Sequence, residues 1–140
     1  MQPTPSQVQA DWPAPLTLVL PDSELLRLDR QGNAGLLELS SALVQWPSAS
    51  QRRPQQGWVW PLRLQCLGLE TWVVPEFAQG RIASARLRQD GQDLTPQLPA
   101  FYEGRMELQL ELARGGSLCL RARALRITLE GAQLRESLAC

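Results

Sequence analysis

Four tryptophans are the side chains in this sequence best suited to molecular recognition. They stand close together in the middle of the chain, at Trp46, Trp58, Trp60 and Trp72. Tryptophan is enriched in ligand pockets and at the centres of protein interfaces, because its large ring buries much apolar surface. A small β-protein also uses tryptophan to fill its core. The sequence therefore leaves two interpretations open, a Trp-lined binding site or core packing.

The chain contains no histidine, which excludes several common catalytic sites. It cannot build a Ser-His-Asp or Cys-His nucleophile, and it lacks the usual general base near neutral pH. Carboxylate pairs remain for acid–base work, and the candidates are Asp22 with Glu24 and Glu70 with Glu76. Nothing in the sequence around them distinguishes these residues from surface carboxylates. We therefore expect a protein that is not an enzyme.

The three cysteines argue against both a metal site and a disulfide framework. Cys66, Cys119 and Cys140 are too far apart in sequence for a Cys-only zinc site, and their number is odd. Cys66 falls on the apolar phase of its segment and is expected to be buried as a small hydrophobe. Cys119 falls on the polar phase, where we expect it opposite Glu111. No metal and no cofactor is predicted.

The charge pattern argues against a nucleic-acid partner. The 14 acidic and 14 basic residues cancel, and every basic residue is arginine, a bias that a GC-rich bacterial genome explains. Six arginines would form a basic stripe if the segments 80–89 and 117–130 were adjacent strands: Arg81, Arg86, Arg88, Arg121, Arg123 and Arg126. Glutamates are interleaved with them, and no aromatic side chain stands among them to stack on bases.

The chain is predicted to hold one domain preceded by an arm. Residues 1–15 contain four prolines and are expected to form a proline-rich N-terminal arm, while residues 16–140 form a single all-β domain. The start lacks the basic and apolar regions of a signal peptide, and no apolar run is long enough to span a membrane. We therefore expect a cytoplasmic protein without membrane contact.

Alternating apolar residues predict about seven antiparallel strands, arranged as a sandwich or a partly open barrel. The expected strands are 16–20, 24–29, 36–46, 58–66, 80–89, 104–112 and 117–130. The strands 24–29 and 36–46 are separated by a Gly/Asn-rich turn and read as a hairpin. Residues 132–140 are predicted to form a short C-terminal helix, which would place Leu134 and Leu138 together.

The segment 104–130 is predicted to be a second hairpin, in which leucines alternate with charges. A three-residue loop at 114–116 keeps the apolar residues on one face and places Leu112 opposite Leu118. After Ala124 the apolar phase changes, which requires a bulge, a bend or a crossing from one sheet to another.

The segment 58–66 is predicted to be the strand most open to a partner. Its apolar residues share one phase of a two-residue repeat: Trp58, Trp60, Leu62, Leu64 and Cys66. Pro61 cannot donate to a sheet ladder, so this strand is expected at a sheet edge or at a bulge. An exposed edge can pair with a second copy of the chain, which favours a homodimer.

The stretches "PDSELLRLDRQGNAGLLELSSALV" (21–44) and "GRIASARLRQDGQDLTPQLPAFYEGRMELQLEL" (80–112) resemble small bacterial all-β proteins of unknown function. The first is similar to their opening hairpin, where an Asp-containing turn leads into a run of leucines. The second, with the hairpin that follows it, is similar to their later half. The resemblance implies an all-β fold and brings no activity and no site residues with it.

Together these features favour a non-catalytic, cytoplasmic binding or protein-interaction domain that self-associates. Two alternatives stay open. One is a β-barrel that binds a small molecule in a Trp-lined pocket, and the other is an immunity-type partner of a toxin. The expected partners are a second copy of the chain or another protein.

Overall fold

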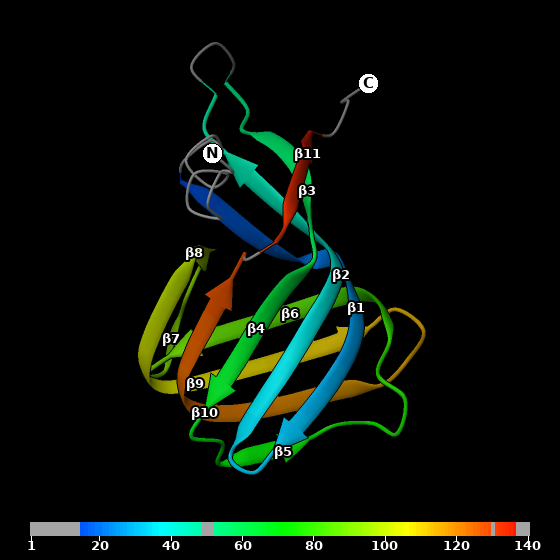
Figure 1. Ribbon diagram of the computed structural model, residues 1–140, viewed down its shortest axis with the longest axis vertical. Helices are drawn as coiled ribbons and strands as arrows, with labels where there is room; N and C mark the ends of the chain where they lie inside the picture. Colours follow the sequence, from blue (N-terminus) through cyan, green and yellow to red (C-terminus); the bar gives the residue numbers. More distant parts are fainter. Residues whose placement is uncertain (1–14, 49–51, 130, 137–140) are drawn as a thin grey trace, which may run out of the picture.

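The fold is all-β, as predicted. The computed structural model describes residues 15–48, 52–129 and 131–136, and the regular elements among them are all strands (Figure 1). They are β1 (Leu16–Gln31), β2 (Ala34–Trp46), β3 (Gln55–Trp60), β4 (Leu62–Leu67), β5 (Thr71–Val73), β6 (Gly80–Gln89), β7 (Gln92–Asp93), β8 (Gln97–Leu98), β9 (Ala100–Leu112), β10 (Ser117–Thr128) and β11 (Gln133–Glu136). The predicted arm at 1–15 lies almost wholly outside the described residues.

Six strands close into an antiparallel barrel, in the order β1–β2–β4–β10–β9–β6, with β6 returning to β1. The inward side chains are mainly leucines, and the largest fully buried ones include Leu25, Leu37, Leu62, Leu64, Ile82, Leu110, Leu120, Leu125 and Ile127. The interior of this barrel is therefore packed with side chains, as expected for a barrel of so few strands.

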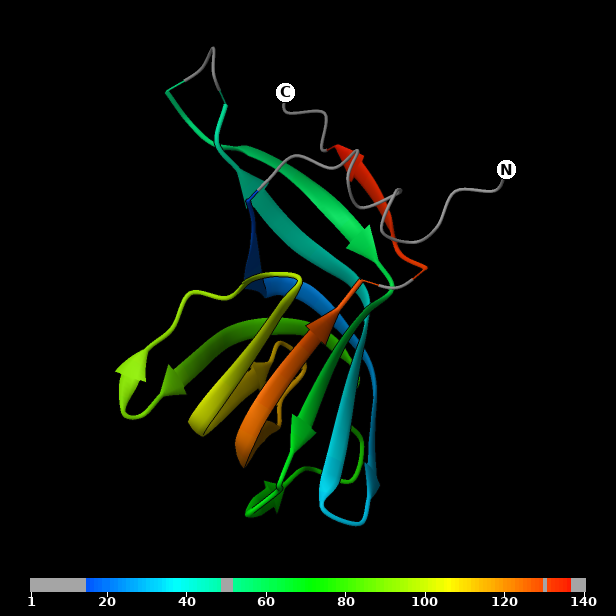
Figure 2. The same ribbon diagram turned by 60° about the vertical axis from the view of Figure 1, so that its left-hand side comes forward.

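A second sheet continues from one end of the barrel, and Figure 2 shows it above the barrel strands. Its strands follow the order β8–β1–β2–β3–β11, with the N-terminal part of β1 and the C-terminal part of β2 shared between the two sheets. We call this group the upper sheet. The long hairpin of β1 and β2 therefore contributes strands to both sheets.

The buried side of the strands inverts at the boundary between barrel and upper sheet. In β2, Leu37 and Leu39 are buried below the boundary, whereas Ala42 and Val44 are buried above it, on the other phase. Strands β3 and β4 run along β2 in one unbroken register and invert at the same level, between Val59 and Leu62. The same ribbon therefore buries one face in the barrel and the other face in the upper sheet.

Strand β1 makes this inversion through a large bulge. Four of its residues, 20–23, lie opposite the single residue Ala42 of β2. Ser23 is fully buried there, and its hydroxyl donates to the Val19 carbonyl at 2.7 Å and accepts from the Leu43 amide at 2.9 Å. The hydroxyl satisfies backbone groups that the bulge removes from the ladder, which a buried site requires.

Two expected boundaries are wrong because of this bulge. The segments 16–20 and 24–29 were expected as separate strands divided at Pro21, but they form one strand, β1. Pro21 is tolerated because it lies within the bulge, where regular pairing with β2 is interrupted.

The predicted edge strand at 58–66 is also wrong. Residues 57–59 are paired with both β2 and β11, and β4 is paired with both β2 and β10. On the side away from β2, the neighbouring strand changes at Pro61. It is β10, which ends at Thr128, along β4, and β11, which begins at Gln133, along β3. A residue without an N–H is accepted there because the ladder is already interrupted.

The predicted common phase of this segment is kept, but its burial is not uniform. Trp58 pairs with Leu43 and Leu62 pairs with Leu39, two residues on the same face of β2. This face is buried in the barrel at Leu62, whereas in the upper sheet the other face is buried, at Val59, and Trp58 and Trp60 are half-buried.

In the hairpin of β9 and β10 the apolar residues lie on one face, as predicted, but their cross-strand partners differ from the predicted ones. Leu118 lies opposite Leu110 rather than Leu112, and Cys119 lies opposite Gln109 rather than Glu111. The chain turns one residue earlier than expected, since the Leu112 amide donates to the Gly116 carbonyl at 2.9 Å. A shift of two residues preserves the alternation, so the apolar face is unchanged.

The change of phase in β10 is confirmed as a bulge. Its register with β9 shifts between Ala122 and Ala124, after which Leu125 and Ile127 become the buried residues. An equivalent bulge in β6 falls between Ile82 and Ser84.

The second half of the chain holds a further effect of a bulge and one correction. Alternation along 80–89 places Ala83 on the phase of the buried Leu87, but the β6 bulge leaves Ala83 exposed. The helix predicted for 132–140 is wrong, because 133–136 form β11, in which Leu134 pairs with Val59; residues 137–140 lie outside the described part. Sheet pairing along β3 outweighs the weak helical spacing of two leucines.

Replacing Ser23 with alanine should destabilise the fold. The Leu43 amide and the Val19 carbonyl would lose a buried partner, which costs about 1–3 kcal/mol of unfolding free energy. Urea denaturation followed by tryptophan fluorescence measures the change.

Ser84→Ala is the matched control, because the Ser84 hydroxyl makes an exposed hydrogen bond to Glu111 at 3.1 Å. Its effect should stay within about 0.5 kcal/mol. Equal losses in the two variants would contradict the role assigned to Ser23.

Candidate functional site

Trp46 is a core residue of the upper sheet. Its side chain is 4% exposed, and its indole N–H donates to the Gln55 side-chain oxygen at 2.7 Å. The ring lies so close to Gly57 that a Cβ added there would stand 3.0 Å from it. Trp46 therefore packs between the ends of β2 and β3, with its one polar atom satisfied.

Trp58 and Trp60 lie on the other face of β3. Both are half-buried, and Trp58 lies directly across from Leu43 on β2 and Arg135 on β11. They share a face with each other, but not with Trp46, because Trp46 follows the phase of Val44.

Trp72 lies at the far end of the molecule from the other three. It belongs to β5, which pairs with β10, and its ring covers Gly35 so closely that a Cβ there would be 2.4 Å from it. Gly35 begins the barrel part of β2, whereas Trp46 ends the strand. The structure therefore brings Trp58 and Trp60 together and does not gather the four tryptophans into one pocket.

The groups considered for catalysis are dispersed. Asp22 pairs with Arg81 at 3.0 Å and Glu70 pairs with Arg123 at 3.2 Å. Among the described residues no three of the Cys, Asp and Glu side chains are grouped as a metal site would need. No helix in the described part of the chain is long and apolar enough to cross a membrane.

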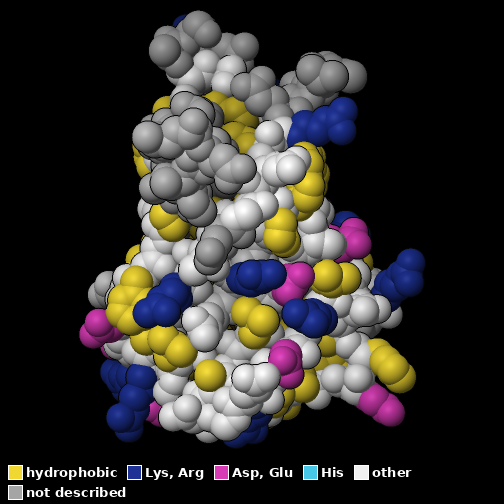
Figure 3. All heavy atoms as spheres, viewed as in Figure 1, with side chains coloured by type: hydrophobic (Ala, Val, Ile, Leu, Met, Phe, Trp, Pro, Cys, Tyr) yellow, Lys and Arg dark blue, Asp and Glu magenta, His cyan; other side chains and the backbone are white. Residues whose placement is uncertain are grey.

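The arginines do not form a stripe. Strand β9 separates β6 from β10, so the adjacency that such a stripe would require is absent. Five of the six arginines lie 3.0–3.4 Å from a carboxylate oxygen: Arg81, Arg86, Arg88, Arg121 and Arg123. The sixth, Arg126, stacks on Phe101 at 5.2 Å. Figure 3 shows the two charge signs interspersed over the barrel.

An exposed apolar surface surrounds the segment between β5 and β6. Phe77 is 84% exposed, and beside it a groove of about 530 Å³ runs between this segment and the C-terminal part of β1, lined by Leu26, Leu28, Trp72, Val74, Phe77 and Ala78 among others. Gln79 links the segment to β1, because its side-chain amide donates to the Leu26 backbone carbonyl at 3.0 Å. Of the predicted site residues, only Trp72 contributes to this groove.

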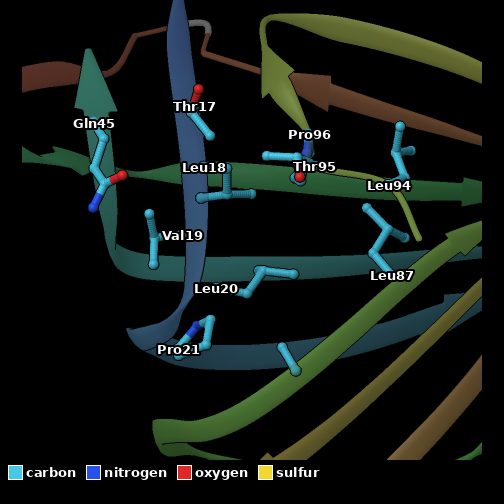
Figure 4. A pocket seen from close by; sticks show the side chains of 11 residues that line it. Thr17, Leu18, Val19, Leu20, Pro21, Gln45, Leu87, Leu94, Thr95 and Pro96 are labelled. Carbon is cyan, nitrogen blue, oxygen red and sulfur yellow. The ribbon is translucent and has the colours of Figure 1, made fainter. Parts of the chain in front are cut away.

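A smaller apolar pocket opens between β1 and β6. It has a volume of about 280 Å³, and Figure 4 shows Leu20 of β1 and Leu87 of β6 on opposite sides of it, with Leu94, Thr95 and Pro96 above them. None of the predicted site residues lines it.

The sequence pattern indicated neither surface in advance. Phe77 stands alone among polar and small residues after Pro75, and an isolated aromatic in a loop is as compatible with a buried anchor as with an exposed one. The second pocket is made from ordinary strand leucines, whose place at a gap in the barrel depends on pairings distant in sequence.

Comparison with known proteins identifies no relative. No family model matches the chain, and neither a curated protein nor a solved structure matches it.

The stability of the protein should fall at alkaline pH because of Cys66. The thiol is 3% exposed, and burial raises its pKa from 9.0 to about 12. Between these values the unfolded chain releases this proton while the folded chain keeps it, so rising pH favours unfolding. The free energy of unfolding then falls by up to about 1.4 kcal/mol per pH unit.

Urea titrations at about pH 8 and about pH 10.5 measure this loss, expected to be about 2 kcal/mol. Cys66→Val should lose this part of the pH dependence, and Cys119→Val, at a half-buried position, should retain it. A pH dependence unaltered in Cys66→Val would contradict the assignment.

Proposed function

We propose that the protein is a non-catalytic interaction module that self-associates through the surface formed by Leu26, Trp72, Val74 and Phe77. This set is called the Phe77 surface below. The observation that carries the proposal is the 84% exposure of Phe77 beside a groove that the same surface provides. A large aromatic side chain held in water is unfavourable unless a partner covers it.

A second copy of the chain fits this surface because the protruding Phe77 side chain and the groove lie on the same patch. In a two-fold dimer each copy presents the same surface to the other, so Phe77 of each chain can enter the groove of its partner. Leu26 is 41% exposed, lines the same groove and extends the apolar area around Phe77.

The charges around the groove are self-complementary. Its lining includes the basic residues Arg27 and Arg30 and the acidic residues Asp29 and Glu76. A two-fold contact can therefore place a positive rim residue of one copy against a negative one of the other, which favours a defined orientation. The zero net charge of the chain adds no overall repulsion between copies.

Other properties of the chain support the same class of function. The absence of histidine and the pairing of Asp22 and Glu70 with arginines favour binding over catalysis. The neutralised arginines disfavour a nucleic-acid partner. The free thiols of Cys66 and Cys119 support the cytoplasm as the proposed compartment.

Phe77→Ser should convert the protein to a monomer. Burying a phenylalanine contributes about 1.5–3 kcal/mol, and a two-fold interface loses two of them, so the dimer dissociation constant should rise at least about 100-fold. Sedimentation velocity over a concentration series measures this change.

Phe101→Ser is the matched control, because Phe101 is also exposed, at 47%, and lies on β9 under Arg126. It should leave the dimer intact. A wild-type chain that sediments as a monomer at every concentration, or equal dissociation of both variants, would rule out this interface.

A further inference from the structure

The barrel wall has a gap between β1 and β6. These strands pair only at Glu24↔Arg81 and Leu25↔Gly80 and then separate. The segment 92–98 crosses between them, pairing with β6 through β7 and with β1 through β8. The pocket of about 280 Å³ occupies the opening bounded by β1, β6 and this crossing segment (Figure 4). We call this opening the wall pocket.

One side of the wall pocket is a strand edge without a strand partner. Between Ile82 and Leu87, no strand among the described residues pairs with β6 on the side facing β1. The Leu87 carbonyl is turned to this side, because it accepts from the Leu94 amide at 2.9 Å. Backbone groups of alternate residues in an antiparallel strand point the same way, so Ala85 presents its N–H and C=O to the pocket.

The remaining lining is mostly apolar and carries no charge. Leu18, Leu20 and Leu87 in it are buried, and Ala85 and Leu94 are half-buried. The polar side chains are Thr17, Gln45 and Thr95, and the lining contains no Asp, Glu or Arg. An ion entering this pocket would lose water without gaining a counter-charge, which is costly.

We propose that the wall pocket binds a small, neutral, largely apolar molecule that carries one group able to pair with the Ala85 backbone. The volume lies near the lower end of the range for ligand sites, so the ligand is small. The apolar part fills the space over Leu20 and Leu87, and an amide or similar group completes the strand edge. The wall pocket shares no lining residue with the groove of the Phe77 surface, so the inference is independent of self-association.

Hexanamide is a suitable probe, because it joins a short apolar chain to a neutral amide. Titration of the full-length protein with hexanamide, followed by ¹H–¹⁵N NMR, should shift the amide resonances of the pocket residues in a saturable manner. Hexylammonium has a chain of similar length and a positive charge, and it should cause no saturable shift there.

Ala85→Leu should weaken hexanamide binding by at least about tenfold, because a misfit of even one methylene in an apolar pocket has an effect of this size. Ala83→Leu is the matched control, since Ala83 is exposed on the same strand. It should leave affinity unchanged. The dispersion of the NMR spectrum shows whether each variant is folded.

Three results would overturn the proposal. They are the absence of saturable shifts in the wild-type protein, shifts that map away from the pocket residues, and equal binding of hexylammonium. If Ala85→Leu fails to fold, the wild-type shift map and the comparison of the two probes still decide the question.

Discussion

Ser23 makes possible the feature on which the whole architecture depends, the passage of one ribbon from a barrel into a second sheet. Strand β1 interrupts its ladder with β2 at this point, and an interrupted ladder in a buried place leaves backbone groups without partners. The Ser23 hydroxyl serves both the Val19 carbonyl and the Leu43 amide at this point. A bulge is thereby stable in the core.

The neighbouring strands invert at the same level by other means. Along β3 and β4 the change falls at Pro61, where the strand on the far side changes from β10 to β11. The buried face changes at the same level in β1, in β2 and along the ribbon of β3 and β4. The apolar residues of each sheet therefore stay on a common side. The barrel can then be filled by leucines, and any binding has to use its outer surface or a defect in its wall.

The two candidate surfaces differ in how they arise. The Phe77 surface exists because a short segment between β5 and β6 is held against β1 by Gln79 and leaves its aromatic residue 84% exposed. The wall pocket exists because β1 and β6 separate after two residue pairs, leaving the barrel closed there only by a crossing segment. Both suit recognition by apolar contact, which agrees with a chain whose exposed arginines are largely matched by carboxylates.

The sequence by itself determined the fold class, the positions of most strands and the burial of Cys66, because alternation with a period of two is a local property of strands. It also indicated that β10 is irregular near Ala124, where the structure has a bulge, since a change of phase is visible in one strand. Only the tertiary structure decided that Trp46 and Trp72 lie far apart, that the segment 58–66 is paired on both sides, and that 133–136 form a strand. These outcomes depend on which distant strand becomes the neighbour, and that choice reflects packing across the whole barrel rather than the residues of any one segment.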